Sequence, residues 1–203
     1  MSLSKYKKGY LKELKEKNEL FYEGKSALNW GEMIDGKYQI SDRYHFEWKK
    51  PNQKNDLIKI EGDIEDYILN FVRTSEKKVT VFIGVDSQNY LLSTTYVCVI
   101  SLYVEKSGAH LLVAKLKMPK IYDYRYRLLA EADMLGEISR KFEPFFQKNN
   151  IEVVGRHLDY NPSTAKKSNG VVTEATNYLK HLGFNINIKP LSWAASHCAD
   201  FFC

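Results

Sequence analysis

The stretch VTVFIGVDSQNYLLSTTYVCVISLYVEKSGAHLLVAKLKM, residues 79–118, decides the fold. It holds three runs rich in β-branched and aromatic residues, at 79–87, 94–105 and 109–118, separated by the brief polar breaks QNYLLS and KSG. Such composition is typical of β-strands. Because connections this short join antiparallel neighbours, the stretch predicts a three-strand meander.

After Pro119 the hydrophobic pattern changes its period, and helical and extended segments alternate. The predicted elements are a helix over 124–147, a strand over 152–160, a helix over 171–182, a strand over 185–189 and a short helix over 192–202. Helices between strands imply right-handed crossovers, so the strands that begin at 79, 152 and 185 should be parallel. The sequence therefore predicts an α/β domain with a mixed five-stranded sheet.

The chain before this domain has a different texture. A lysine-rich stretch is followed by an aromatic, glycine-punctuated one, and KPNQKND around Pro51 predicts a loop or linker. Apolar residues at helical spacing then predict a helix over 57–73. We place a domain boundary at the linker, with an extension at 1–55 and the main domain at 56–203.

Overall composition narrows the protein classes that fit. The 203 residues, 44% of them hydrophobic, suffice for one medium domain and an extension. No run of about twenty apolar residues or signal-peptide block occurs, so we expect a soluble cytoplasmic protein. Three cysteines without a CxxC pair argue against a disulfide framework or structural zinc. A net charge of +5 is compatible with a nucleic-acid partner.

Two predicted parallel strands end in aspartate, at Asp86 and Asp159. Ligand sites of open α/β sheets collect at the carboxyl ends of parallel strands, so both carboxylates should reach the same edge. Each aspartate alone could equally cap the turn that follows its strand.

Further acids fall on the predicted helices. Glu131 interrupts an otherwise apolar helical face, where a carboxylate is paired, metal-bound or close enough to the edge to reach solvent. Asp133 and Glu137 lie off this face and are expected to be solvated. Asp200 belongs to the terminal helix, whose alanines permit close approach to the sheet, although taken alone it fits an ordinary exposed acid. The apolar face of the long helix consists of Leu128, Leu135, Ile138, Phe142 and Phe145.

Four segments in this order resemble the ribonuclease H-like superfamily: IGVDSQ, RLLAEADMLGEIS, EVVGRHLDYNP and KPLSWAASHCAD. Within it the chain resembles the YkuK-like family of predicted bacterial and phage nucleases, over residues 57–203. The resemblance implies that Asp86, Glu131, Asp159 and Asp200 are the catalytic and metal-binding acids. It also implies cleavage of RNA, of an RNA–DNA hybrid or of structured DNA.

Four carboxylates suit magnesium or manganese, which prefer hard oxygen ligands. Two such ions about 4 Å apart can activate water and stabilise charge on the attacking and leaving oxygens. We therefore expect two Mg²⁺ or Mn²⁺ ions. The alternative is a nucleic-acid-binding or assembly protein that keeps this fold without turnover.

Three basic side chains are candidates for substrate binding: His157, His197 and Lys189. His157 lies on the same strand face as Asp159, His197 lies one helical turn before Asp200, and Lys189 ends the last predicted strand. Ordinary packing or solvent exposure would explain each of them as well. The extension over 1–55 could track a phosphate backbone with its lysines, stack bases on its aromatic residues, or dock a protein partner. A solvated face explains the lysines as well, and packing against the main domain explains the aromatic residues.

Overall fold

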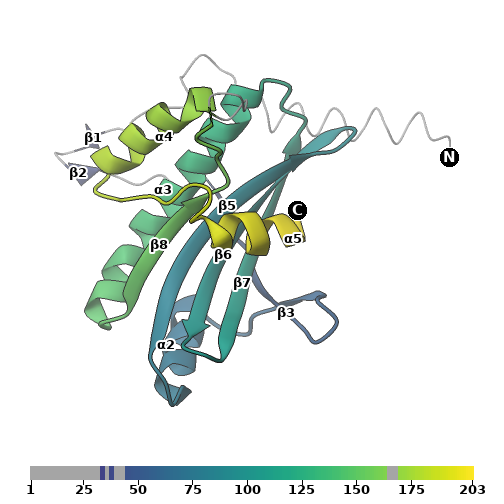
Figure 1. Ribbon diagram of the computed structural model, residues 1–203. Helices are drawn as coiled ribbons and strands as arrows, with labels where there is room; N and C mark the ends of the chain where they lie inside the picture. The colour runs from purple at the N-terminus through teal and green to yellow at the C-terminus, as the bar shows by residue number, and fades with distance from the viewer. Residues whose placement is uncertain (1–32, 35–36, 39–43, 164–168) are drawn as a thin grey trace, which may run out of the picture.

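The computed structural model describes residues 33–34, 37–38, 44–163 and 169–203. Its main feature is a six-stranded sheet in the order β4-β3-β7-β6-β5-β8 (Figure 1). A separate pair, β1 (Met33–Ile34) and β2 (Lys37–Tyr38), is antiparallel. The strands of the sheet are β3 (Trp48–Pro51), β4 (Leu57–Lys59), β5 (Val79–Asn89), β6 (Ser93–Val104), β7 (Gly108–Pro119) and β8 (Glu152–Leu158).

The predicted meander forms the centre of this sheet. Strands β5, β6 and β7 pair antiparallel, and β8 pairs parallel with β5 on the other side. The α/β class and the parallel direction of the strand that begins at 152 are thereby confirmed. Val85 pairs with Leu158, so the chain positions that follow, including Asp86 and Asp159, lie at one edge.

The sheet extends beyond β7 through β3 and β4, which the sequence did not predict. β3 pairs antiparallel with both β7 and β4, and the KPNQKND segment supplies the turn of the β3–β4 hairpin. The helix predicted over 57–73 begins only at α2 (Ile64–Thr74), because Gly62 adopts a φ of 79° and Asp63 caps the helix. Strand β3 lies before position 55 and β4 lies after it, so the sheet includes residues from both sides of the predicted domain boundary.

The fifth predicted strand, over 185–189, is not a regular strand. Only Asn187 forms a bridge, and it is parallel to His157. The Asn187 carbonyl accepts from the Leu158 N–H at 3.1 Å, and the Lys189 N–H donates to the Tyr160 carbonyl at 3.0 Å. The next residue, Pro190, has no N–H to continue the pairing. The expected five-stranded sheet is thus six-stranded with a different edge.

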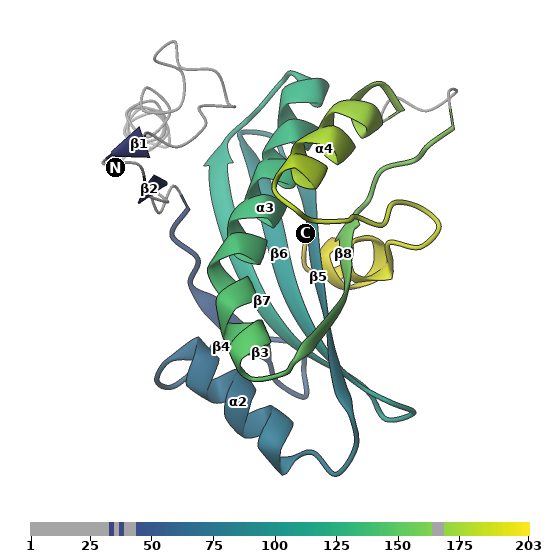
Figure 2. The same ribbon diagram turned by 90° about the vertical axis from the view of Figure 1, so that its left-hand side faces the viewer.

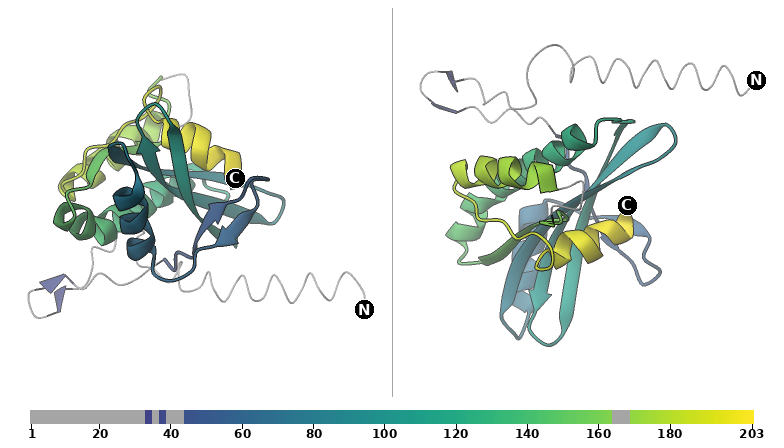
Figure 3. Two further views of the ribbon diagram at one scale, coloured as in Figure 1. Left: turned by 90° about the horizontal axis from the view of Figure 1, so that it is seen from below. Right: turned by 45° about the horizontal axis from the view of Figure 1, so that its top comes forward.

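Helices cover both faces of the sheet. On one face lie α3 (Tyr124–Lys148) and α4 (Asn169–His181), while the chain end crosses the other face as a π-helical turn, η1 (Ala194–Ala199), and α5 (Asp200–Phe202) (Figure 2). The two further views in Figure 3 show the same layers. No helix within the described ranges is long and apolar enough to cross a bilayer.

Helix α3 is buried on nearly all sides, which corrects the expectation for Asp133 and Glu137. Their exposed fractions are 6% and 8%. Asp133 accepts hydrogen bonds from the hydroxyls of Tyr44 (2.8 Å) and Tyr178 (2.7 Å), and Glu137 pairs with Arg140. The segment at Tyr44 and helix α4 cover the helix face that the sequence pattern assigned to solvent.

Candidate metal centre

Asp86 and Asp159 lie beside each other at the carboxyl edge of β5 and β8. Burial raises the pKa of Asp86 to about 7, the Ser87 backbone N–H opposes this shift, and the charges of Asp159 and Asp200 add to it. Because like charges act on one another over a few ångströms, this pKa indicates an acidic cluster.

Glu131 reaches the same region from α3. Its side chain is 1% exposed, and burial, followed by the charge of Asp86, raises its pKa well above the usual range. Oε1 accepts a hydrogen bond from the Ser87 hydroxyl. Oε2 is buried and has no hydrogen-bond partner among the described residues. The carboxylate therefore has one oxygen held by the protein and one oxygen unpartnered.

Asp159 shows a similar division between its two oxygens. Oδ2 lies 2.9 Å from the Lys189 ammonium, whereas Oδ1 is buried and has no hydrogen-bond partner in the part of the chain that the structure describes. Lys189, predicted to bind substrate, is thus the counter-ion of one of the acids.

Two residues that support the acids, Ser87 and Arg127, were not identified from the sequence. Arg127 donates from Nη1 to the Ser87 hydroxyl at 2.9 Å and to the Ser87 carbonyl. Its positive charge also lowers the pKa values of Asp86 and Glu131. The spacing of four residues between Arg127 and Glu131 on a helix was the available signal, since it places both on one side.

Asp200 is brought to the cluster by close packing of η1 on β5. A Cβ added at Gly84 would lie 2.5 Å from the carbonyl carbon of Ala194, so only glycine permits this approach. Asp200 itself is exposed at the start of α5. The Cys203 thiol lies 3.9 Å from Oδ2 of Asp86, on the same face.

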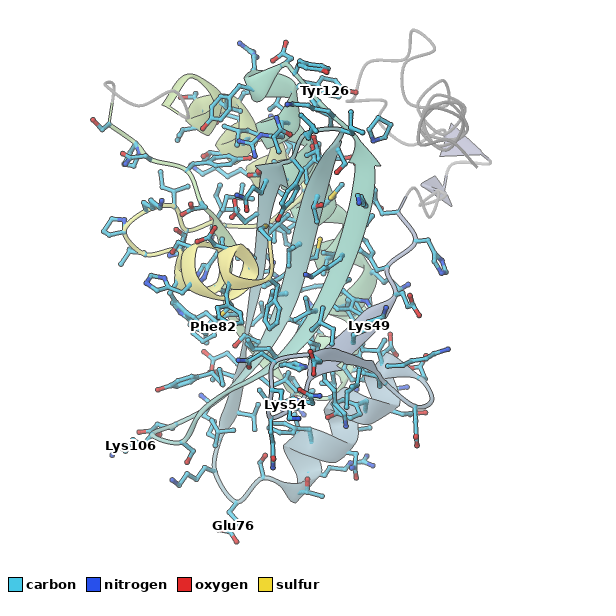
Figure 4. The ribbon with its side chains drawn as sticks, turned by 90° about the vertical axis from the view of Figure 1, so that its right-hand side faces the viewer. Lys49, Lys54, Glu76, Phe82, Lys106 and Tyr126 are labelled. Atoms are coloured by element: carbon cyan, nitrogen blue, oxygen red, sulfur yellow. The ribbon has the colours of Figure 1, made fainter. Side chains whose placement is uncertain are left out.

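The two histidines occupy different environments. His157 is 2% exposed, its Nδ1 accepts from the Ala194 N–H at 3.0 Å, and burial lowers its pKa to about 4. Its ring packs against Phe82, which lies beside η1 in Figure 4, and against Trp193. The structure therefore places His157 inside the fold as a neutral support for η1. His197 is exposed, with Nδ1 3.0 Å from the Ser196 hydroxyl.

The donor atoms of the cluster fit a hard divalent cation. A buried carboxylate oxygen without a donor is costly, and both Glu131 Oε2 and Asp159 Oδ1 are in this state. All four acids offer only oxygen, the ligand that Mg²⁺ and Mn²⁺ prefer. In the part of the chain that the structure describes, no three His, Cys, Asp or Glu side chains converge as ligands around one point. The acids are therefore close enough to interact electrostatically and their chemistry fits the ions, but within the described ranges their oxygens do not surround a common point.

Comparison with known proteins gives one match. The family model described as ribonuclease H-like matches residues 63–203, which include all four acids. Neither the curated proteins nor the solved structures give a match.

Proposed function

The chain belongs to the ribonuclease H-like family, and from this premise we propose that it is a metal-dependent nuclease. Its reaction would be hydrolysis of phosphodiester bonds in RNA, in an RNA–DNA hybrid or in structured DNA. The observation that carries the proposal is the pair of buried, unpartnered carboxylate oxygens on Glu131 and Asp159, next to Asp86. The finer likeness to the YkuK-like branch and the cytoplasmic location remain predictions.

Four acids would hold two Mg²⁺ or Mn²⁺ ions. These acids would be Asp86, Glu131, Asp159 and Asp200. When bound, such ions supply a metal-activated water and neutralise charge on the attacking and leaving oxygens. Because the cations would offset the mutual repulsion of the carboxylates, bound metal would lower the free-energy cost of holding these acids close together.

The surrounding side chains would orient these acids. The hydroxyl of Ser87, which Arg127 holds in turn, fixes Oε1 of Glu131, and this leaves Oε2 for a cation. Fixed outer partners of this kind preserve ligand orientation and metal affinity. Lys189, 41% exposed and 2.9 Å from Asp159, would exchange this carboxylate for a substrate phosphate.

A second candidate function is nucleic-acid binding without turnover. One observation favours it, since Lys189 already neutralises Asp159. A protein partner bound through residues 1–55 is compatible with either function. The lysine-rich stretch at the start of this extension, a candidate for binding the phosphate backbone, lies outside the described residues.

A cleavage panel tests the proposal. The protein is incubated with end-labelled single-stranded RNA, RNA–DNA hybrid, duplex DNA and a four-way junction, with Mn²⁺, Mg²⁺ or EDTA. We expect metal-dependent cutting of at least one substrate by the wild type and none by Asp86→Asn. Binding without cutting in Mn²⁺ would support the second candidate instead.

A further inference from the structure

Exposed aromatic and apolar side chains gather at one end of the sheet. Among the described residues, eight large hydrophobic side chains are exposed, and four of them belong to two neighbouring segments. Tyr90 (43%) and Leu91 (80%) occupy the turn between β5 and β6, while Tyr122 (83%) and Tyr124 (37%) follow β7. Solvent-exposed apolar patches of this kind mark binding surfaces.

Hydrogen bonds fix these two segments to each other. The Asn89 side-chain amide donates to the Ile121 carbonyl at 2.9 Å, and the Ile121 N–H donates to the Thr94 hydroxyl at 2.8 Å. The label of Tyr126 in Figure 4 marks this end of the molecule. The exposed rings therefore project from a connected rim, which we call the aromatic rim and define as Tyr90, Leu91, Tyr122 and Tyr124.

The aromatic rim adjoins the acids. The Tyr90 hydroxyl donates to the Cys203 carbonyl, and the Cys203 thiol lies 3.9 Å from Oδ2 of Asp86. The Tyr124 ring centroid lies 5.1 Å from the guanidinium carbon of Arg127, the residue that holds Ser87 and, through it, Glu131. A nucleotide stacked on the rim would consequently have its backbone beside the candidate metal centre.

A cation lies over the ring of each of two rim residues, Tyr122 and Tyr124, and this pairing indicates the chemistry of the partner. The Lys120 ammonium is 5.4 Å from the centroid of Tyr122, and Arg127 accompanies Tyr124. The nearby acid Asp123 is engaged as the cap of α3, where it accepts from the Tyr126 N–H at 3.1 Å. Proteins bind single-stranded nucleic acids with rings that stack on bases and cations that meet the phosphate backbone; Lys120 is such a cation here, whereas a duplex hides the faces of its bases.

We propose that the aromatic rim binds unpaired bases, so that the substrate class is single-stranded RNA or DNA or a single-stranded part of a larger structure. This inference rests on the proposed function, because the bound strand would be the substrate of the nuclease. It concerns binding alone, however, and can be tested without metal.

The test is fluorescence anisotropy of the full chain in EDTA with a labelled 12-nucleotide strand, its duplex and an abasic strand of equal charge. RNA and DNA versions of each probe separate the two sugars. We expect the single strand to bind at least about tenfold more tightly than the duplex or the abasic strand, since stacking contributes on this scale per base. Tyr122→Ala should weaken binding of the single strand about tenfold, whereas Tyr122→Phe should retain it.

The matched control is Ile58→Ala, which removes an exposed apolar side chain (42%) from β4, a different part of the sheet. Because Tyr122 is exposed, its replacement should leave the melting temperature unchanged. Equal or tighter binding of the duplex, or wild-type affinity in both Tyr122→Ala and Tyr124→Ala, would overturn the inference. Ring-dependent binding without cutting in Mn²⁺ would support the inference while refuting the nuclease proposal.

Discussion

The hydroxyl of Ser87 donates a hydrogen bond to Oε1 of Glu131, and this contact joins strand β5 to helix α3 beside Asp86. Successive strand residues point to opposite faces of a sheet. Asp86 therefore faces η1, while Ser87 faces α3 and meets the glutamate. Two consecutive residues of β5 thus have different roles: Asp86 is itself an acid of the cluster, and Ser87 holds the carboxylate of Glu131.

Removal of the Ser87 hydroxyl should weaken metal binding more than it weakens the fold. Ser87→Ala leaves Oε1 of the buried Glu131 without this donor, and the loss of such outer partners typically costs about 10- to 100-fold in metal affinity. Calorimetric titration with Mn²⁺ measures this loss. Ser101→Ala is the matched control, because the Ser101 hydroxyl is also buried in the sheet but has no hydrogen-bond partner. Equal Mn²⁺ affinity in both variants would contradict the role given to Ser87.

The raised pKa of Asp86 predicts a pH-dependent stability. Its folded pKa, about 7, exceeds the ordinary value of 3.8, so between these values the folded state holds a proton that the unfolded state releases. The free energy of unfolding in EDTA should therefore fall as the pH rises from about 4 to about 7, and then level off. Denaturant unfolding of wild type and Asp86→Asn at each pH isolates this contribution as their difference. A difference that stays constant across this range would refute the assignment.

Metal should counteract that loss of stability. Mn²⁺ competes with the proton on Asp86, so the rise in melting temperature on adding millimolar Mn²⁺ should grow between pH 5 and pH 7. Thermal melts with and without the ion measure it. A melting temperature that Mn²⁺ leaves unchanged at pH 7 would show that these acids do not form a metal centre in the isolated chain.

Lys189 should oppose metal binding in the absence of substrate. Its ammonium occupies Oδ2 of Asp159, and a partly exposed ion pair contributes up to about 1 kcal/mol, so Lys189→Gln should raise the Mn²⁺ affinity about two- to fivefold. Lys78→Gln is the control, since it breaks a lysine–glutamate pair with Glu152 at the opposite end of β8. A weaker affinity in Lys189→Gln would mean that the lysine orients Asp159 for the ion.

The close packing of η1 should be sensitive to a single methyl group. Gly84→Ala would place Cβ against the backbone of Ala194, and overpacking of this kind costs about 1–3 kcal/mol. We expect a lower melting temperature together with a weaker response to Mn²⁺, because Asp200 is carried by the displaced segment. Gly170→Ala on α4, where an added Cβ meets nothing within 4 Å, should be neutral or stabilising. Wild-type stability of Gly84→Ala would contradict the packing described.

Local pattern was sufficient for the central strands and for the places of the acids. Asp86 and Asp159 could be located because strand ends of a parallel pair share an edge, and Glu131 because it breaks an apolar helical face. These features depend on residues close in the chain or on a single repeating period. The predicted roles of the four acids remain to be tested.

Other features depend on contacts between distant segments. Asp133 was expected in solvent, and its burial depends on Tyr44, 89 residues earlier, and Tyr178, 45 residues later. The segment 185–189 has the composition of a strand, yet its pairing is limited to the bridge at Asn187. His157 was placed on the correct face, but the covering η1 excludes it from solvent. None of these partners can be read from a short window of sequence.

The central claim is tested most directly by cleavage of a substrate from the panel by the wild type and by Glu131→Gln, measured across concentrations of Mn²⁺ and Mg²⁺. Glutamine keeps the size of the buried side chain and removes its charge, and the control Glu65→Gln alters a half-buried acid at the start of α2, away from the cluster. We predict metal-dependent cutting that Glu131→Gln abolishes and Glu65→Gln preserves. Cutting in EDTA, or undiminished cutting by Glu131→Gln, would contradict a metal-dependent nuclease built on these carboxylates.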